Sequence, residues 1–319
     1  MKKPITPALV ALTFVLAAIF SFQSPAFSSD NTHVAEVPLL DWPIEIVSEG
    51  HGFTEGAAIG PDGSVYFSDL DNGYILKFDP DSGETSVWNE KSNFSNGLFI
   101  VDHWMYACEA TGRCVVRYDL NKGPNSRKVI VDRFDGKKLG SPNDLAVFGN
   151  QLAFSSFFWK KKLPENDNER QIFENRSYVA NLDSGEVLAV PHEFQTPNGV
   201  LYDPKNEYLY LGEMKNSEIY RTKVTNGKLG PVELFFDLKT INKGKPDGMS
   251  VDPDGRLYVA LFGMSDQLLI LSPDAKPIGA LPTGHRTSNC TITTNGKILY
   301  ITADLKLKRV QIPPLGRNL

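Results

Sequence analysis

Short apolar segments, each followed by a turn and a second segment rich in aromatic residues, recur along most of the chain. The first such unit runs from Glu55 through the turn Pro61-Asp62-Gly63 to Val65–Asp69. Six units follow this scheme, and each opens on a carboxylate or amide residue: Glu55, Asn96, Asn143, Asn198, Asp247 and Asn289. Consecutive openers lie 41 to 55 residues apart, and no segment keeps a helical period. The pattern therefore predicts a repeat of several short strands.

A repeat of this length, built from short strands, is typical of a β-propeller blade. The sixth unit ends after its third strand, whereas the strand Pro43–Val47 precedes the first unit without a partner. We expect this strand to complete the last blade, because ring closure removes exposed sheet edges. The prediction is an all-β fold, a six-bladed β-propeller over residues 43–319. Two packed β-sandwiches are the alternative, which explains the strands but not the period.

Composition agrees with one globular unit and excludes one class of partner. Of 319 residues, 41% are hydrophobic and 22% are charged, which suffices for a normal core. The 33 Lys and Arg residues against 38 Asp and Glu residues give a net charge of -5 at pH 7. We expect no nucleic-acid partner, because nucleic-acid binding calls for a basic face.

The N-terminus has the order of a secretory signal. Lys2 and Lys3 precede the apolar run Ala8–Phe20, and the small-residue stretch Ser24-Pro25-Ala26 follows. We predict a signal peptide over residues 1–28, an extension over 29–42, and a secreted or periplasmic protein with no membrane association after cleavage. An uncleaved N-terminal anchor is the alternative.

Export would allow disulfide bonds, yet the chain has only three cysteines. Cys108 and Cys114 flank an expected hairpin turn, so the two thiols either face each other in a cross-strand disulfide or stay free. Cys290 is expected to be a small buried residue.

The six opening residues carry the candidate chemistry. The first strand of each propeller blade lines the central channel, so corresponding residues of six blades form a ring. Every member of this ring has a side-chain oxygen, and only Glu55 and Asp247 are acidic. One hard divalent cation would satisfy such a set, and oxygen ligands favour Ca²⁺ over Zn²⁺. The alternative is a set of turn and channel-lining residues without a metal.

Several motifs resemble those of the SMP-30/gluconolactonase/LRE-like family of calcium-dependent, six-bladed propeller lactonases. They are Phe53-Thr54-Glu55-Gly56, Ser141-Pro142-Asn143-Asp144, Pro197-Asn198-Gly199-Val200, Pro246-Asp247-Gly248-Met249 and Thr287-Ser288-Asn289-Cys290. The resemblance implies metal ligands at Glu55, Asn143, Asn198 and Asp247, with Asp247 also acting as base or nucleophile. It implies hydrolysis of lactones or other esters. Members that act on sugar lactones carry an Arg just before the Asn-Asp pair, and this chain has Gly140-Ser141-Pro142 there.

Other residues are candidates for substrate contact. Asn96 and Asn289 complete the ring beside the implied ligands. His51 and His285 each precede a ring residue by four positions, so both are expected in loops at the channel mouth, as a general acid or as solvated side chains. Trp159 lies in an aromatic cluster before a long polar stretch, and this segment is either a pocket wall with a lid or an ordinary loop.

The sequence thus favours a secreted, metal-dependent hydrolase of small-molecule lactones or esters, with Asp247 as base. We expect one divalent cation, Ca²⁺ first and Mg²⁺, Mn²⁺ or Zn²⁺ as substitutes, and a monomer or weak oligomer. The alternative from another class is a non-catalytic propeller that binds a ligand or partner and holds a structural Ca²⁺. A metal-free propeller of the strictosidine-synthase type is a third hypothesis, which the two acids Glu55 and Asp247 oppose.

Overall fold

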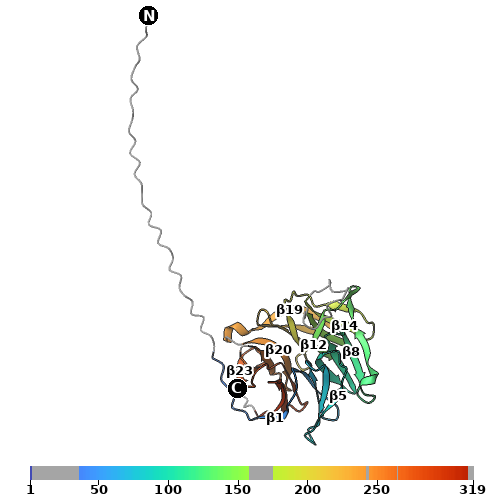
Figure 1. Cartoon of the computed structure of the whole chain (residues 1–319). Coiled ribbons are helices and arrows are strands. Elements are labelled where there is room, and N and C mark those ends of the chain that lie inside the picture. Colours follow the sequence, from blue (N-terminus) through green and yellow to red (C-terminus); the bar gives the residue numbers. More distant parts are fainter. Residues whose placement is uncertain (2–35, 158–174, 242–243, 264, 315–319) are drawn as a thin grey trace. The chain divides into compact units, whose positions relative to one another are not determined.

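A computed structural model of the chain describes Met1 and residues 36–157, 175–241, 244–263 and 265–314. Within these residues the strands form six four-stranded antiparallel sheets and one two-stranded hairpin. The innermost strands of the sheets contact one another in cyclic order, so the sheets are the blades of a closed propeller (Figure 1). The predicted all-β, six-bladed propeller is confirmed. The predicted signal peptide lies, apart from Met1, outside the described residues.

The strands of each blade follow one another from the channel outward. The first blade contains β2 (Thr54–Ile59), β3 (Val65–Asp69), β4 (Tyr74–Phe78) and β5 (Thr85–Asn89). The second contains β6 (Ser95–Val101), β7 (Trp104–Glu109), β8 (Cys114–Asp119) and β9 (Lys128–Val131). The third contains β12 (Ser141–Phe148), β13 (Gln151–Phe157), β14 (Arg176–Asn181) and β15 (Val187–Ala189). The fourth blade contains β16 (Pro197–Asp203), β17 (Tyr208–Glu213), β18 (Glu218–Thr225) and β19 (Lys228–Asp237). The fifth contains β20 (Lys245–Val251), β21 (Leu257–Phe262), β22 (Gln267–Leu271) and β23 (Pro277–Leu281).

The sixth blade joins the two ends of the propeller. It consists of β24 (Asn289–Ile292), β25 (Ile298–Ala303), β26 (Lys306–Gln311) and, outermost, β1 (Ile44–Ser48). Ile44 of β1 lies opposite Val310 of β26 in an antiparallel pairing. The strand that precedes the first unit therefore completes the last blade, as the sequence predicts.

Short elements lie in the connections. They are the hairpin of β10 (Arg133–Phe134) and β11 (Lys137–Lys138) and the 3-10 helices η1 (Pro124–Ser126) and η3 (Leu238–Ile241). None of the described helices reaches the length and hydropathy that a bilayer-spanning segment needs. Before β1, the backbone at Pro38 and Leu40 exchanges hydrogen bonds of 2.9 Å with Ala280 on the outer strand of the fifth blade. This contact covers part of a sheet edge that would otherwise be open.

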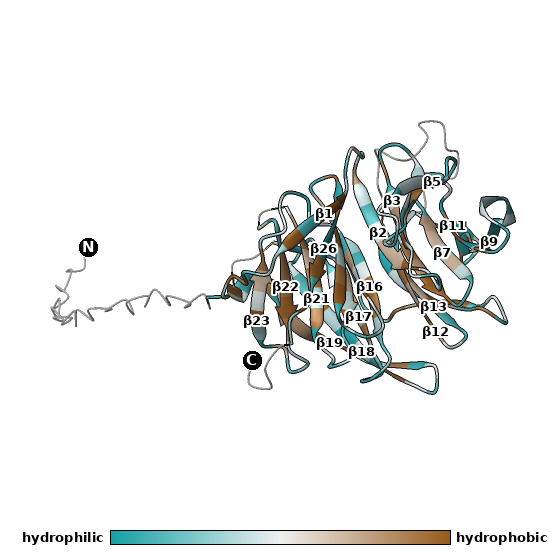
Figure 2. Cartoon of the chain, turned by 90° about the horizontal axis from the view of Figure 1, so that it is seen from below, coloured by the Kyte–Doolittle hydropathy of each residue, from teal (hydrophilic) through white to brown (hydrophobic). Residues whose placement is uncertain are grey.

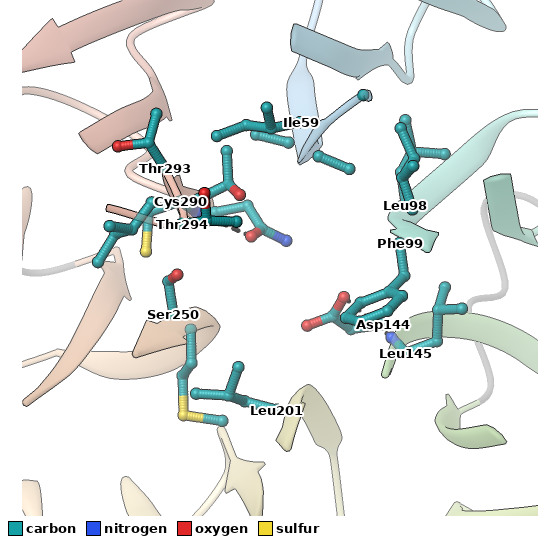
Figure 3. Close-up of a pocket in the computed structure, with 18 of the residues that line it drawn as sticks. Ile59, Leu98, Phe99, Asp144, Leu145, Leu201, Ser250, Cys290, Thr293 and Thr294 are labelled. Atoms are coloured by element: carbon teal, nitrogen blue, oxygen red, sulfur yellow. Dashed lines mark hydrogen bonds between the residues drawn. The ribbon is translucent and has the colours of Figure 1, made fainter. Parts of the chain in front are cut away.

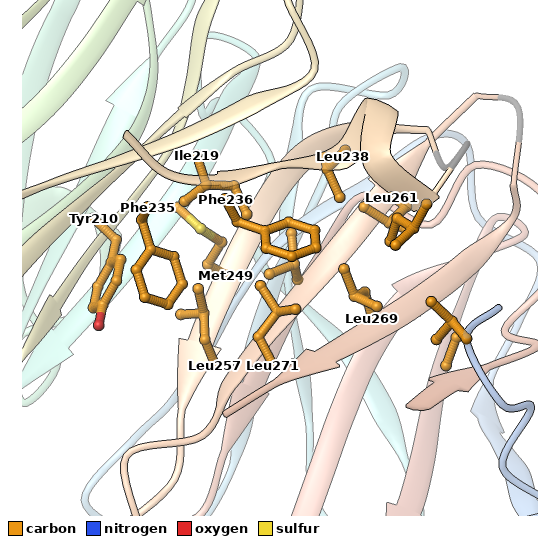
Figure 4. Packing of buried hydrophobic residues seen from close by; sticks show 14 residues of the cluster. Tyr210, Ile219, Phe235, Phe236, Leu238, Met249, Leu257, Leu261, Leu269 and Leu271 are labelled. Atoms are coloured by element: carbon orange, nitrogen blue, oxygen red, sulfur yellow. The ribbon is translucent and has the colours of Figure 1, made fainter. Parts of the chain in front are cut away.

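The core consists of six hydrophobic clusters, one between each pair of neighbouring blades. Between the fourth and fifth blades, Phe235 and Phe236 of β19 pack against Leu257 and Leu271 (Figure 4). A middle strand such as β21 has blades on both sides, so both of its faces are buried. This explains why β21 and β22 are coloured mainly hydrophobic in Figure 2 and do not alternate between polar and apolar residues.

Within the described residues the cysteines form no disulfide, and all three are buried and free. Cys108 lies opposite Val115 in the pairing of β7 and β8, whereas Cys114 lies opposite Glu109. Successive side chains of a strand point to opposite faces, so the two thiols enter different clusters on either side of the sheet. The disulfide interpretation is therefore wrong, because the pairing is offset by one residue from the one that would bring the thiols together.

Candidate functional site

The six ring residues are the first, second or third residues of the innermost strands. Each of them is buried, with no more than 6% of its surface exposed. They lie in β2, β6, β12, β16, β20 and β24, and these strands neighbour one another around the channel. The channel end at which these residues lie is called here the ring face of the propeller.

Local backbone geometry directs these side chains toward the channel. In five blades the pairing between the first and second strands shifts register at the ring residue, as between Glu55 and Ala58 or between Pro246 and Met249. Such a bulge redirects the side chain that it contains. The following glycine is needed for close packing: at Gly56, whose φ is +45°, a Cβ atom would collide with the backbone oxygen of Asn96.

Acidic side chains gather at the ring with little to neutralise them. Burial, followed by the nearby charge of Asp144, raises the pKa of Glu55 to about 8. Burial and the charges of Glu55 and Asp144 raise the pKa of Asp247 well above its ordinary value. These carboxylates are close enough to repel each other in a site that excludes water, so a nearby positive charge would stabilise their ionised forms.

The amide members of the ring complete the arrangement. The side chain of Asn289 lies near Glu55 and that of Asn198 near Asp247, and each amide lowers the pKa of the neighbouring carboxyl, in opposition to burial. The Nδ2 atom of Asn198 also lies 2.9 Å from the sulfur of Met214. Its carbonyl oxygen Oδ1 is buried and has no hydrogen-bond partner in the described part of the chain. An unsatisfied buried acceptor is costly, so this oxygen needs a ligand that donates or carries positive charge.

These observations together test whether a divalent cation fits. Among the described residues no three His, Cys, Asp or Glu side chains are placed to hold a metal ion by themselves. A cation site at the ring would therefore need amide oxygens in addition to Glu55 and Asp247. The buried, unpartnered Oδ1 of Asn198 is such an oxygen. Mixed carboxylate and amide oxygens suit a hard cation such as Ca²⁺, so the donor set fits the group.

One buried acid at this site was not identified from the sequence. Asp144 follows Asn143, and its carboxylate accepts hydrogen bonds of 3.0 Å from the backbone N–H groups of Leu145 and Val200. It thereby links the third blade to the fourth. Burial raises its pKa to about 7. The signal in the sequence is that four other units have glycine at the corresponding position, where this unit has aspartate.

A cavity in the channel lies on the other side of the ring residues. It has a volume of about 650 Å³ and is lined by the far ends of the innermost strands and the turns beyond them. Figure 3 shows Asp144 and Ser250 directed into it from different blades. Of the ring residues only Asn289 lines this cavity. The predicted ligands thus lie nearer the ring face, and the cavity approaches them from the opposite face.

The candidate residues of the mouth have different surroundings. His51 is half-buried, its Nε2 atom lies 2.7 Å from Ser48 Oγ and its ring contacts Phe67 edge-on; burial lowers its pKa. His285 is exposed, with its Nδ1 atom 3.4 Å from Asp266 Oδ1. Both precede innermost strands and so lie in loops on the ring face, as expected. Trp159 lies outside the described residues.

Beside the second blade the structure reveals a polar network that the sequence did not suggest. Glu109 is fully buried at the ring-face end of β7, and Arg127 donates two hydrogen bonds to it, of 2.7 and 2.6 Å. Tyr118 and Asn93 also donate to Glu109. The network fixes the loop before Asn96, so it supports the ring without belonging to it.

Comparisons with known proteins give consistent results. A family model described as SMP-30/Gluconolactonase/LRE-like region matches residues 53–304. A gluconolactonase of Zymomonas mobilis is 24% identical over 308 residues, which covers 86% of this chain and 82% of that protein. The structure of a gluconolactonase from Xanthomonas campestris superposes with a TM-score of 0.76 at 23% identity, covering 87% of this chain and 92% of that one. That of regucalcin, a calcium-binding protein from Agrobacterium tumefaciens, gives 0.69 at 16% identity, covering 87% and 95%.

Proposed function

The chain belongs to the SMP-30/gluconolactonase/LRE-like family, and from that premise we propose that it is a divalent-cation-dependent lactonase. The observation that carries the proposal is the ring itself: two buried, mutually repelling acids beside a buried amide oxygen without a partner. The names of the relatives support the reaction class, because two of them are gluconolactonases. The order of residues at the N-terminus supports a secreted or periplasmic protein.

Four residues would hold the cation: Glu55, Asn143, Asn198 and Asp247. Ca²⁺ is the expected ion, because the donors are all oxygens and no thiol or imidazole belongs to the set. The regucalcin neighbour is described as calcium-binding, which agrees with this choice. A bound cation would also neutralise the repulsion between the two acids, so binding and folding would be coupled.

When bound, the cation would supply Lewis-acid polarisation of the lactone carbonyl. Asp247 would accept a proton from the water that attacks the carbonyl carbon. The bond between that carbon and the ring oxygen then breaks, and the departing alkoxide takes up the proton from Asp247, giving a hydroxy acid. Asn96 and Asn289 occupy the ring positions on either side of Glu55 and would donate hydrogen bonds to the substrate. The buried walls of the ring limit access of bulk water.

The direct test is hydrolysis of a panel of γ- and δ-lactones, followed by acid release in a pH-stat. We expect turnover that a chelator abolishes and Ca²⁺ restores. Asp247→Asn should lower kcat by at least about a hundredfold while the chain still folds. Asp254→Asn, which alters an exposed acid of a turn on the opposite face, is the matched control and should be active. A protein that binds Ca²⁺ and opens no lactone would instead be a ligand- or partner-binding propeller.

A further inference from the structure

Three side chains on the ring face form a wall beside the channel, which we call the mouth wall: Phe53, Phe262 and Arg286. The rings of Phe53 and Phe262 meet edge to face, with centroids 5.9 Å apart and an interplanar angle of 64°. The guanidinium carbon of Arg286 lies 5.7 Å from the centroid of Phe53. Residues from the first, fifth and sixth blades therefore contact each other at the channel end where the ring residues lie.

The mouth wall stands next to the two acids of the ring. Phe53 precedes Glu55 by two residues. Phe262 is the cross-strand partner of Lys245, which in turn precedes Asp247 by two residues. A substrate whose carbonyl lies at these acids would therefore extend its far end past the aromatic rings.

The loop that carries Arg286 is rigidly held. Thr283 and Thr287 join their hydroxyls at 2.6 Å, and Thr287 also donates to the backbone oxygen of Gly284 at 2.9 Å. The backbone N–H of Asp304 donates to the oxygen of the residue before Arg286 at 2.6 Å. Arg286 itself has a φ of +55°, in the left-handed region that few non-glycine residues occupy. Backbone strain of this kind persists where the surroundings fix it, so the fold sets the backbone position from which the Arg286 side chain extends.

The mouth wall carries positive charge that the described part of the chain does not neutralise. Arg286 and Lys245 are exposed, and neither forms an ion pair with a described residue. Asp266 faces His285, with its Oδ1 atom 3.4 Å from the imidazole Nδ1. A guanidinium presents a planar set of donors that matches a carboxylate or phosphate in two parallel hydrogen bonds.

We infer that the mouth wall selects lactones that carry an anionic group, a carboxylate or a phosphate, at the end remote from the carbonyl. Arg286 binds the anion as a specificity-determining residue, Lys245 adds charge, and Phe53 and Phe262 contact the apolar face of the lactone ring. This inference rests on the proposed lactonase function.

The experiment compares two lactones that differ only at the terminal carbon, glucono-1,4-lactone and glucaro-1,4-lactone, in which an anionic carboxylate replaces the neutral hydroxymethyl group. Wild-type protein should show the higher kcat/KM on the anionic lactone. Arg286→Gln should lower kcat/KM for that lactone roughly tenfold, mainly through KM, because the contact is remote from the reacting bond. The neutral lactone should lose less than about threefold. Lys297→Gln removes one charge from an exposed turn on the opposite face and should change neither value.

Each result separates this inference from its premise. Equal losses on both lactones in Arg286→Gln, or no loss on either, would overturn the anion preference while the lactonase function stands. A wild-type protein that opens neither lactone, nor any other of the panel, would overturn the function and the inference with it. If Arg286→Gln does not fold, Lys245→Gln must show the same selective loss, in smaller degree, for the inference to hold.

Discussion

Replacing Glu55 by glutamine should stabilise the cation-free protein at pH 8 and have little effect at pH 5. The reason is that Glu55 is 3% exposed, and burial together with Asp144 raises its pKa from the ordinary 4.5 to about 8. A carboxyl group with a raised pKa binds its proton more tightly in the folded state than in the unfolded state. The stability of the folded state therefore falls as pH rises from about 4.5 to about 8.

The magnitude follows from this shift. A pKa of about 8 in place of 4.5 corresponds to an electrostatic cost on the order of 4–5 kcal/mol for the ionised group. Glutamine has nearly the same shape and carries no charge, so Glu55→Gln removes most of that cost at pH 8. For a domain of this size the gain corresponds to a rise in Tm of roughly 6–10 °C.

Thermal unfolding in the presence of a chelator, at pH 5 and at pH 8, measures this difference. Excess Ca²⁺ should reverse the order at pH 8, because the wild-type site binds the ion and is stabilised by mass action, whereas the variant lacks a carboxylate ligand. Lys297→Gln is a neutral control for the loss of one surface charge. If Glu55→Gln destabilised the chelator-treated protein equally at both pH values, ionisation of Glu55 would carry no electrostatic cost in the folded state. That result would refute the reasoning.

Three further predictions concern the surroundings of the ring. Gly199→Ala should lower Tm and lactone turnover together, because the added Cβ would collide with the backbone oxygen of Asp247. Gly230→Ala is the control: its added Cβ would make only ordinary van der Waals contacts, so it should have little effect in the same assays. Arg127→Ala should cost about 3–5 kcal/mol in urea unfolding, because it leaves Glu109 buried without its counter-charge; Arg309→Ala, which breaks an exposed pair, should cost less than about 1 kcal/mol. Thiol titration of the unfolded, non-reduced protein should find three free cysteines, and a value of one would contradict the offset strand pairing.

The fold was predictable because the repeat is visible in the sequence. Six units with matching opening residues specify six blades. The unpaired strand before the first unit can complete only the sixth blade, which has three strands of its own. Element boundaries within units were also accessible, since middle strands such as Leu257–Phe262 are apolar on both faces. The hairpin Arg133–Lys138 was not predicted, because its few residues carry no periodic pattern.

The ring was predictable from the same repeat, but its electrostatics were not. The sequence places Glu55 and Asp247 in corresponding positions, and the fold brings them within reach of each other's charge. The repeat does not point to Asp144, because four other units have glycine at that position and the repeat is defined by what the units share. The sequence leaves open whether Cys108 and Cys114 pair, because a one-residue offset in strand pairing, invisible in the sequence, reverses the face of a side chain. Arg286 depends on loop geometry that only the folded chain shows.

The central claim, that the ring binds one divalent cation through carboxylate and amide oxygens, is tested most directly by calorimetric titration of chelator-treated protein with Ca²⁺. We predict one ion per chain and an affinity that falls at least tenfold in Asn198→Ala, which removes the buried oxygen that has no partner among the residues the structure describes. Absence of saturable binding, or equal binding in wild type and variant, would contradict the account.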